Sequence, residues 1–258
     1  MTEAVIVALI TPFNDKLEID FESITKHVQF LVQSGIKCLL VGGTTGESLA
    51  LEPEERRLIT THIRTLFPKI KLLGCVTALS INQAIKIIDE FSNCDALLVT
   101  SQYFINPSSS DVLFYIQKIA SICNKPIILY NNPSRLKFCM SEIYKKLYQT
   151  IPNIIGVKES GSAKNIDTSL IKWKWWAGND INYIDYLNAE AFGIISMVAN
   201  IYPKEMLHAI KNKFTSYEFN QKIINICKFS NPVGVKFTAH KLNLISTPYT
   251  RFAFQLPK

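Results

Sequence analysis

Lys158 is the residue whose position in this sequence most strongly suggests chemistry. It ends the largely apolar segment 153–157 and is followed directly by Glu159 and Ser160, so its amine lies where a buried strand is expected to end. An unpaired ammonium inside a strand would be costly to remove from water. At the exit of a strand into a pocket, desolvation favours the neutral amine, which is a nucleophile toward carbonyl groups. Lys158 is therefore a candidate Schiff-base lysine, and the alternative is a surface lysine whose stem lies along a strand end.

Side chains suited to binding or proton transfer follow other apolar runs. A glycine-rich turn contains Thr44 and Thr45, whose hydroxyls and backbone amides could hold a carboxylate. Tyr130 ends a later run and precedes Arg135, and Gly178 follows another run. Each has a structural alternative: glycine-rich loops are common, Tyr130 could be a core aromatic, and Arg135 could be a solvated loop residue. Their occurrence after successive runs favours one shared site.

Short apolar runs alternate with amphipathic segments through most of the chain. Most runs are apolar at both odd and even positions, as expected for parallel strands that are buried on both faces. The eight predicted strands are Val5–Ile10, Cys38–Val41, Ile70–Val76, Ala96–Val99, Pro126–Tyr130, Ile154–Val157, Trp173–Ala177 and Phe192–Met197. The helices predicted between them are Asp20–Gln33, Glu52–Leu66, Asn82–Phe91, Asp111–Cys123, Ser141–Tyr148, Ile166–Ile171 and Asp180–Asn188.

This order predicts an α/β fold, a (β/α)8 TIM barrel with a short C-terminal helical extension. An open, doubly wound sheet is the alternative, because periodicity cannot show closure. We expect residues 1–202 to form the barrel core, and residues 203–258 to form the last barrel helix and a truncated C-terminal helical segment. The helices predicted there are Lys204–Lys213, Tyr217–Phe229 and Val235–Leu242.

Composition limits the classes of partner. The 258 residues carry a net charge of +7, but the lysines are dispersed, which disfavours a nucleic-acid interface. No apolar stretch is long enough for a membrane span, and the N-terminus lacks a leader pattern, so we expect a cytoplasmic protein without membrane contact. The six cysteines lack redox or metal-ligand spacing, and the four histidines fall in predicted helices without such spacing. We therefore expect reduced core thiols and no metal.

Several motifs occur together in a specific order. They are GGTTGES at 42–48, YNNPSR at 130–135, GVKES at 156–160, AGND at 177–180 and NPVGVK at 231–236, with Ile195 in the strand between the last two. As an ordered set they resemble the dihydrodipicolinate synthase and N-acetylneuraminate lyase family of pyruvate-dependent class I aldolases, over nearly the whole chain. The resemblance implies a (β/α)8 barrel, and it implies a Schiff base on Lys158 in place of any cofactor.

The resemblance also implies roles for individual residues. Lys158 would condense with the ketone of pyruvate to form an iminium and then an enamine. Thr45 would hold the pyruvate carboxylate, while Gly178 and Ile195 would line the pocket. Tyr130 would transfer protons, because a phenol both donates and accepts hydrogen bonds, and Thr44 would link it to a relay leading out of the site.

Arg135 indicates the second substrate. An arginine at this position resembles the synthases of the family, in which its guanidinium grips the carboxylate of L-aspartate 4-semialdehyde. The resemblance thus implies a reaction of lysine and diaminopimelate biosynthesis. The alternatives are another pyruvate-dependent lyase of the family, acting on sialic acid or a 2-keto-3-deoxy sugar acid, and a non-catalytic barrel derived from it.

The chain departs from the family's pattern at several positions. Phe104 occupies the position of a relay tyrosine that crosses from a neighbouring subunit, so Tyr103 or a water chain would have to supply the hydroxyl. The positions that would form a lysine feedback site carry few groups able to bind an ammonium, which predicts insensitivity to L-lysine. They are Leu49, Pro53, Arg56, Leu79, Gln83 and Tyr103. The resemblance implies a homo-oligomer, either a dimer or a tetramer.

Overall fold

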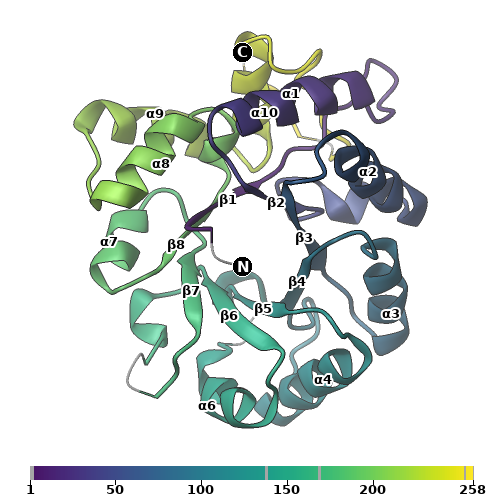
Figure 1. Cartoon of the computed structure of the whole chain (residues 1–258), viewed down its shortest axis with the longest axis vertical. Coiled ribbons are helices and arrows are strands. Elements are labelled where there is room, and N and C mark those ends of the chain that lie inside the picture. Colours follow the sequence, from purple (N-terminus) through teal and green to yellow (C-terminus); the bar gives the residue numbers. More distant parts are fainter. Residues whose placement is uncertain (1–2, 137–138, 168–169, 253, 258) are drawn as a thin grey trace.

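The chain folds into a closed barrel of eight parallel strands, as the sequence predicted. The computed structural model describes residues 3–136, 139–167, 170–252 and 254–257. Each strand pairs with the next in chain order, and the eighth pairs with the first, which closes the ring (Figure 1). The strands are β1 (Val5–Ala8), β2 (Cys38–Val41), β3 (Lys71–Val76), β4 (Ala96–Thr100), β5 (Ile127–Asn131), β6 (Ile154–Glu159), β7 (Lys174–Ala177) and β8 (Gly193–Ser196). Closure excludes the open sheet that periodicity left possible.

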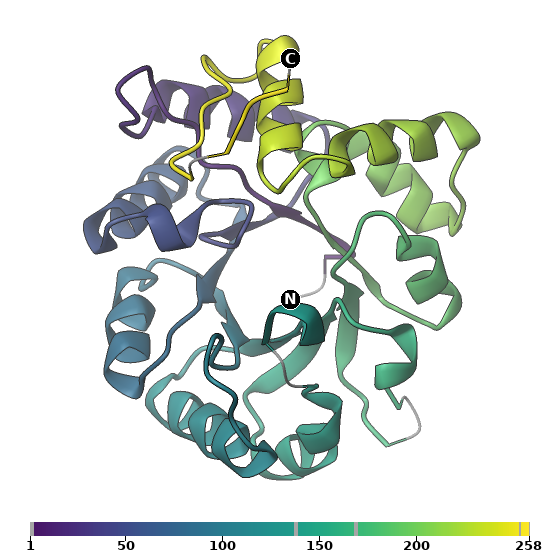
Figure 2. The ribbon, with the colours of Figure 1, turned by 180° about the vertical axis from the view of Figure 1, so that it is seen from behind.

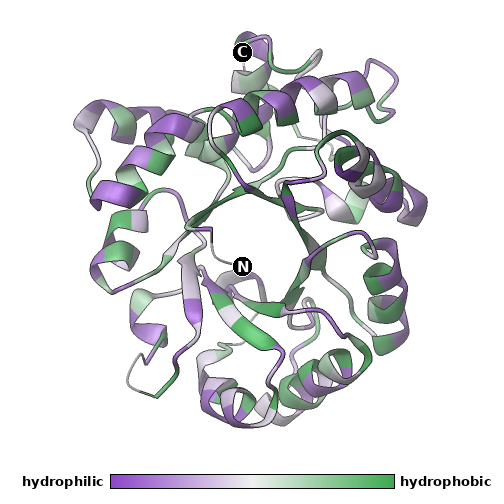
Figure 3. Cartoon of the chain, viewed as in Figure 1, coloured by the Kyte–Doolittle hydropathy of each residue, from purple (hydrophilic) through white to green (hydrophobic). Residues whose placement is uncertain are grey.

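The strands are buried on both faces, which explains their apolar composition. In β2, Cys38 and Leu40 pack with the cluster that fills the barrel, whereas Leu39 and Val41 pack with the larger cluster under the helices. Side chains alternate in this way because successive residues of a strand point to opposite faces. Most of the strand ribbon is accordingly hydrophobic, while the surrounding helices carry both hydrophobic and hydrophilic residues (Figure 3).

Helices cover the outside of the ring, and most begin or end within a few residues of the predicted positions. Asp20 caps the first helix by accepting a hydrogen bond from Ser23 N. The second helix begins at Pro53 behind a capping box of Glu52 and Glu55. The helices are α1 (Phe21–Gln33), α2 (Pro53–Leu66), α3 (Ile81–Glu90), α4 (Ser109–Ile122), α5 (Pro133–Leu136), α6 (Ser141–Thr150), α7 (Tyr183–Asn188), α8 (Pro203–Asn212), α9 (Tyr217–Cys227) and α10 (Val233–Lys241), with short 3₁₀ helices η1 (Ser48–Ala50), η2 (Ala163–Asn165) and η3 (Val198–Asn200).

Two helix predictions were wrong in part. The predicted helix Ile166–Ile171, of which residues 168 and 169 lie outside the described residues, is not a helix in its described part. There the amides of Leu170 and Ile171 both donate to Asp167 O, and so short a segment does not repay the cost of helix nucleation. The helix predicted from Asp180 begins only at Tyr183, since the Asp180 side chain accepts hydrogen bonds from β8 and the turn after it.

The C-terminal segment folds back beside the start of α1. Helices α9 and α10 follow the last barrel helix, α8, and the chain after α10 then returns toward the first loop (Figure 2). Thr247 Oγ1 donates to Phe13 O at 2.6 Å, and Ser246 Oγ donates to Asp20. The division at residue 202 stays a prediction. In the part of the chain that the structure describes, no helix is long and apolar enough to cross a bilayer.

Candidate active site

A cavity of about 510 Å³ opens at the ends of the strands. Seven of the residues that the sequence singled out lie in its wall: Thr44, Thr45, Tyr130, Arg135, Lys158, Gly178 and Ile195. They lie in or directly after β2, β5, β6, β7 and β8, at the carboxyl ends where the loops of a (β/α)8 barrel form its sites. The structure therefore brings together residues that are up to about 150 positions apart in the sequence.

Lys158 projects from β6 into this cavity beside Tyr130 of β5. The two residues are register partners in neighbouring strands, and Lys158 Nζ lies 4.4 Å from the centre of the Tyr130 ring. Only 8% of Lys158 is exposed. The π face of the phenol attracts a cation electrostatically, which helps to hold the amine in place. The amine is thus enclosed in the cavity wall next to a phenol, which is the environment expected of a Schiff-base lysine.

The Tyr130 phenol lies in an electropositive environment. Its oxygen accepts a hydrogen bond from Asn132 Nδ2 at 3.0 Å. Burial alone would raise the pKa of the phenol, but the positive charges of Lys158 and Arg135 oppose this. The polar groups of Asn132 and Ser160 act in the same direction as the charges, and the pKa of Tyr130 lies below its usual value. Tyr130 consequently gives up its proton more readily than an ordinary tyrosine.

Side chains from the N-terminal and C-terminal parts of the chain hold the turn that contains Thr45. Asn231 Nδ2 donates to Thr45 Oγ1 at 3.1 Å, so the Thr45 hydroxyl hydrogen remains available to a bound ligand. Thr11 Oγ1 donates to Gly46 O at 2.8 Å. A Cβ at Gly46 would lie only 2.9 Å from Leu9 O, so the close approach of this turn to β1 requires glycine.

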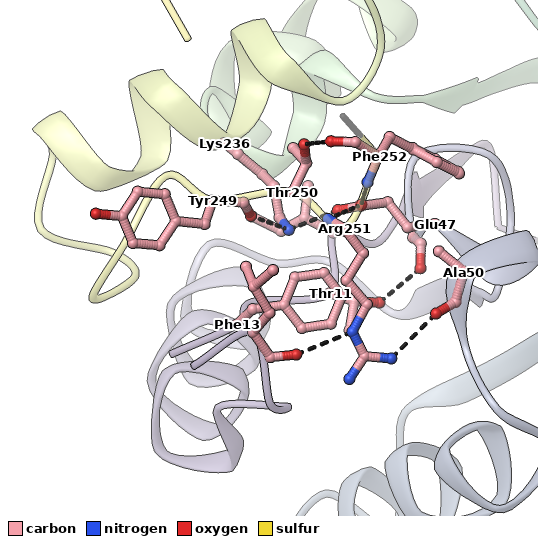
Figure 4. A network of polar contacts seen from close by, with 12 residues as sticks. Thr11, Phe13, Glu47, Ala50, Lys236, Tyr249, Thr250, Arg251 and Phe252 are labelled. Carbon is pink, nitrogen blue, oxygen red and sulfur yellow. Dashed lines mark hydrogen bonds and ion pairs between the residues drawn. The ribbon is translucent and has the colours of Figure 1, made fainter. Parts of the chain in front are cut away.

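The residue after this turn, Glu47, anchors it to the C-terminal segment (Figure 4). Glu47 has a left-handed backbone with φ of 54°, and its carboxylate accepts a hydrogen bond from Lys236 Nζ at 2.6 Å. The other carboxylate oxygen accepts the backbone N–H of Arg251 at 2.8 Å. Burial lowers the pKa of Lys236 to about 8, while the Glu47 charge opposes this shift. Lys236 Nζ also lies 4.1 Å from the centre of the Phe13 ring.

Arg135 reaches across the mouth of the cavity. It lies in α5, directly after β5, and its Nη1 donates to Thr44 Oγ1 at 2.7 Å on the loop after β2. In the view from behind the barrel, α5 lies over the central opening (Figure 2). The link between Thr44 and Tyr130 that the sequence resemblance implied stays a prediction, because Thr44 here accepts its hydrogen bond from Arg135.

Comparison with known proteins decides the family. The model of the dihydrodipicolinate synthetase family matches residues 1–255. The chain belongs to this family. Among curated relatives, the 4-hydroxy-tetrahydrodipicolinate synthase of Wigglesworthia glossinidia brevipalpis is 31% identical over 95% of this chain and 88% of the relative. That of Methanococcus aeolicus is 30% identical over 94% of this chain and 89% of the relative.

Solved structures agree with this assignment. The chain is similar to a chloride-inhibited dihydrodipicolinate synthase from Acinetobacter baumannii in complex with pyruvate. The two are 26% identical, with a TM-score of 0.88, over 99% of this chain and 94% of the other. The whole chain thus corresponds to nearly all of a dihydrodipicolinate synthetase family member.

Buried carboxylates fix the ends of the strands below the site. Asp180 accepts hydrogen bonds from Ser196 Oγ and from Met197 N at 3.0 Å, which ties the loop after β7 to the end of β8. Glu159 accepts two hydrogen bonds from Asn131 Nδ2, at 3.0 and 2.9 Å, which ties β6 to β5. Burial raises the pKa of both carboxyl groups.

Sequence reasoning missed the positioning roles of several of these residues. Asn231 and Lys236 belong to the NPVGVK motif, and Glu47 and Asp180 belong to motifs that had been recognised. The motifs therefore marked the residues as important to this family. Nothing in the sequence indicated that Asn231 would meet Thr45, or that Lys236 would meet Glu47.

The loop after β4 carries Phe104, the position that the resemblance places against a neighbouring subunit. Phe104 is 90% exposed and has a φ of 69°, and it does not line the chain's own cavity. Its neighbour Tyr103 does line the cavity. Within the described ranges, no group of three or more His, Cys, Asp or Glu side chains is arranged to bind a metal ion.

Proposed function

We propose that this chain is a 4-hydroxy-tetrahydrodipicolinate synthase, a lyase that condenses pyruvate with L-aspartate 4-semialdehyde through a Schiff base on Lys158. The observation that carries the proposal is the enclosure of the Lys158 amine, 4.4 Å from the centre of the Tyr130 ring, in the cavity that Thr45 also lines. The family match and the names of the relatives support the same reaction. The proposed place of the reaction is lysine and diaminopimelate biosynthesis.

The first half of the reaction uses Lys158, Thr45 and Tyr130. The unprotonated Lys158 amine attacks the keto carbon of pyruvate, and loss of water from the resulting carbinolamine gives an iminium. The Thr45 hydroxyl donates to the pyruvate carboxylate, since its oxygen already accepts from Asn231. Tyr130 gives and takes the protons of these steps, and its lowered pKa suits that task. The iminium charge acidifies the methyl group, which loses a proton to form a nucleophilic enamine.

The second half uses Arg135 at the mouth of the cavity. The enamine attacks the aldehyde carbon of L-aspartate 4-semialdehyde, and the substrate's own amine then displaces Lys158 and closes the ring. Arg135 binds the carboxylate of this substrate through its planar guanidinium. To do so it exchanges its hydrogen bond with Thr44 for one with the ligand. Gly178 and Ile195 line the same cavity.

No cofactor is needed for this chemistry, because the covalent Schiff base supplies the electron sink. We further propose a cytoplasmic homo-oligomer, a dimer or a tetramer. Apolar side chains on the loops around the cavity support self-association, among them Leu49, which is 62% exposed, and Phe104 and Ile105, which are 90% and 45% exposed. Sedimentation velocity at micromolar concentrations tests this part, and a monomer at all concentrations contradicts it.

Borohydride trapping tests the Schiff base. Treatment with pyruvate and borohydride should inactivate the protein irreversibly and attach the reduced three-carbon adduct to Lys158, as read by peptide mass spectrometry. Lys158→Ala should carry no adduct. Lys174→Ala is the matched control, because Lys174 lies at the opposite, N-terminal end of its strand, against the Phe192 ring. A trapped adduct on another lysine, or none, contradicts the proposal.

A coupled assay tests the second substrate. The wild-type protein should consume pyruvate and L-aspartate 4-semialdehyde together, and Lys158→Ala should not. Cleavage of N-acetylneuraminate or of 2-keto-3-deoxygluconate, without consumption of the semialdehyde, would instead identify another aldolase of the family. A folded protein that forms no adduct and consumes neither substrate would be a non-catalytic barrel.

A further inference from the structure

Ser160 presents a hydroxyl to the cavity beside Lys158. It lies directly after β6, two residues beyond Lys158, and side chains two apart along an extended chain lie on the same side. The residue lines the cavity, and its Oγ is enclosed with no hydrogen-bond partner among the described residues. Most buried polar groups are paired, so an enclosed hydroxyl without a partner is a place where a ligand or water can complete the hydrogen bonding.

Gly178 brings this hydroxyl close to the end of the Lys158 side chain. A Cβ at Gly178 would lie 2.0 Å from Ser160 Oγ and 3.1 Å from Lys158 Cε. Ser160 Oγ and Lys158 Cε therefore both border the space that a side chain at 178 would occupy, so any side chain there would displace one of them. Ser160 Oγ therefore lies no more than about 5 Å from Lys158 Cε.

The same hydroxyl lies near the Tyr130 phenol. As a nearby polar group, the Ser160 hydroxyl makes the smallest contribution to the lowering of the Tyr130 pKa, after burial, the charges on Lys158 and Arg135, and Asn132, although the two oxygens form no hydrogen bond of ordinary geometry. In the loop after β4, Tyr103 lines the cavity, whereas Phe104 carries no hydroxyl, is 90% exposed and lies outside it. Ser160 thus supplies a hydroxyl inside the chain's own cavity, next to both the amine and the phenol.

We infer that Ser160 is a further catalytic residue, which carries a proton from Tyr130 to the oxygen that leaves during Schiff-base formation. The inference rests on the proposed function. Lys158 Nζ first forms a bond to the keto carbon, and its proton moves to the carbonyl oxygen to give the carbinolamine. Ser160 then donates its hydroxyl proton to that oxygen while it accepts the proton of Tyr130. The C–O bond breaks, its electron pair leaves with the oxygen as water, and the nitrogen lone pair forms the C=N bond.

Removal of a proton from the pyruvate methyl group returns Tyr130 to its neutral form. After the iminium has formed, Tyr130 is a phenolate and Ser160 is again a neutral hydroxyl. The phenolate accepts a proton from the methyl group, which yields the enamine and restores the phenol. Every proton is therefore accounted for by Lys158, Ser160, Tyr130 and the keto acid, and no further reactant is required.

Exchange of the pyruvate methyl protons in D₂O tests the inference without the second substrate. Proton NMR follows the loss of the methyl signal, which requires both the iminium and the enamine. Ser160→Ala should slow the exchange at least about tenfold, with the KM for pyruvate changed by less than about twofold, because the hydroxyl acts on the reacting oxygen and not on the carboxylate. The pH profile should also change: the limb that reports the phenol should move to higher pH, since the variant removes one of the groups that lower the pKa of Tyr130.

Ser101→Ala is the matched control. Ser101 Oγ is likewise buried without a partner, directly after β4, two strands away from β6, but Ser101 does not line the cavity. Its exchange rate and pH profile should equal those of the wild type. Both variants remove only an unpaired hydroxyl, so both should melt within a few degrees of the wild-type protein.

The possible outcomes separate the inference from the proposed function. Exchange by the wild type, with an equal rate and an unmoved pH profile in Ser160→Ala, contradicts the role of Ser160 alone. Equal slowing in Ser160→Ala and Ser101→Ala indicates a general structural effect and also overturns it. A wild-type protein that exchanges no methyl protons contradicts the Schiff-base function, and the inference fails with it.

Discussion

Lys236 Nζ and Glu47 Oε1 lie 2.6 Å apart, and neither side chain is exposed to solvent. This ion pair joins α10 to the loop that carries Thr44 and Thr45, although its two residues are 189 positions apart. The charges are further satisfied, because Lys236 donates to Tyr249 O at 2.6 Å and Glu47 accepts the N–H of Arg251. The turn that carries Thr44 and Thr45 and the C-terminal segment are therefore joined by one buried polar network (Figure 4).

Lys236→Met should lower the free energy of unfolding by about 3–5 kcal/mol, as measured by urea denaturation. The substitution removes the ammonium and leaves the Glu47 carboxylate buried without its cationic partner. Adding Glu47→Gln should recover part of the loss, since the charge is then gone and the amide oxygen can still accept the N–H of Arg251. A double variant as unstable as the sum of two single variants would contradict this explanation.

Lys222→Met is the control for the same change of side chain. Lys222 pairs with Glu218 on the surface of α9, at 3.4 Å, and the Glu218 side chain is 83% exposed. Surface pairs of this kind contribute little, so the stability of this variant should stay within about 0.5 kcal/mol of the wild type.

The fold could be predicted because a parallel barrel imposes a pattern on every strand. Burial on both faces makes strands such as β2 and β4 continuously apolar, and the repeat of such runs shows how many strands there are. The gathering of Lys158, Tyr130 and Thr45 followed from the same rule, since loops at one end of a barrel converge. These predictions needed only local sequence and a general property of the architecture.

Contacts between distant side chains could not be predicted in this way. The pairs of Thr45 with Asn231 and of Glu47 with Lys236 depend on how the C-terminal segment returns to the barrel, and no local pattern encodes that path. The four-residue helix α5 was missed for a different reason: it is too short to have a periodicity of its own. Its position decides that Arg135 meets Thr44.

Arg135→Lys should raise the KM for L-aspartate 4-semialdehyde roughly 10- to 100-fold, because a lysine cannot form the two parallel hydrogen bonds of a guanidinium with a carboxylate. Exchange of the pyruvate methyl protons should change by less than about twofold, since that step precedes binding of the second substrate. Steady-state kinetics with each substrate varied in turn provides the measurement.

Arg57→Lys is the matched control for Arg135→Lys. Arg57 donates to Asp89 at 2.6 Å on the outside of the barrel, and the Asp89 side chain is 70% exposed. Both KM values of this variant should equal those of the wild type. If Arg135→Lys also leaves both values unchanged, Arg135 does not bind the semialdehyde carboxylate.

Activity should be insensitive to L-lysine up to millimolar concentrations. Arg56, one of the residues expected at a feedback site, is buried and already satisfied by Glu90 at 2.5 Å and by Ser48 O and Leu51 O at 2.7 and 2.8 Å. The exposed residue Leu49 offers only an apolar surface. An effector that finds no partner for its ammonium gains little differential binding energy. A titration that shows strong inhibition at sub-millimolar L-lysine would contradict this prediction.

Stability should fall between pH 6.5 and 4 because of His27. This imidazole lies on the buried face of α1, with Nε2 3.2 Å from Asn200 Oδ1, and its Nδ1 is buried without a partner among the described residues. Asn200 Nδ2 donates to Ala8 O and Met197 O, so Oδ1 is the acceptor and His27 carries its proton on Nε2. Burial lowers the pKa of His27 from 6.5 to about 4, while the hydrogen bond with Asn200 opposes the shift.

The direction of this change in stability follows from which state of the chain binds the proton. Between pH 6.5 and 4 the unfolded chain binds a proton on His27 that the folded chain does not, so the free energy of unfolding decreases as the pH falls through this range, by roughly 3 kcal/mol in total from this residue. Above pH 6.5 the contribution of His27 to the free energy of unfolding is complete.

Because carboxyl groups titrate in the same range, the measurement is the difference between wild type and His27→Gln in urea denaturation at pH 7 and at pH 4.5. The variant should lose less stability than the wild type between the two values, and His62→Gln, which changes a half-buried imidazole on α2, should lose as much as the wild type. Equal losses in wild type and His27→Gln would mean that the folded protein protonates His27 at its ordinary pKa.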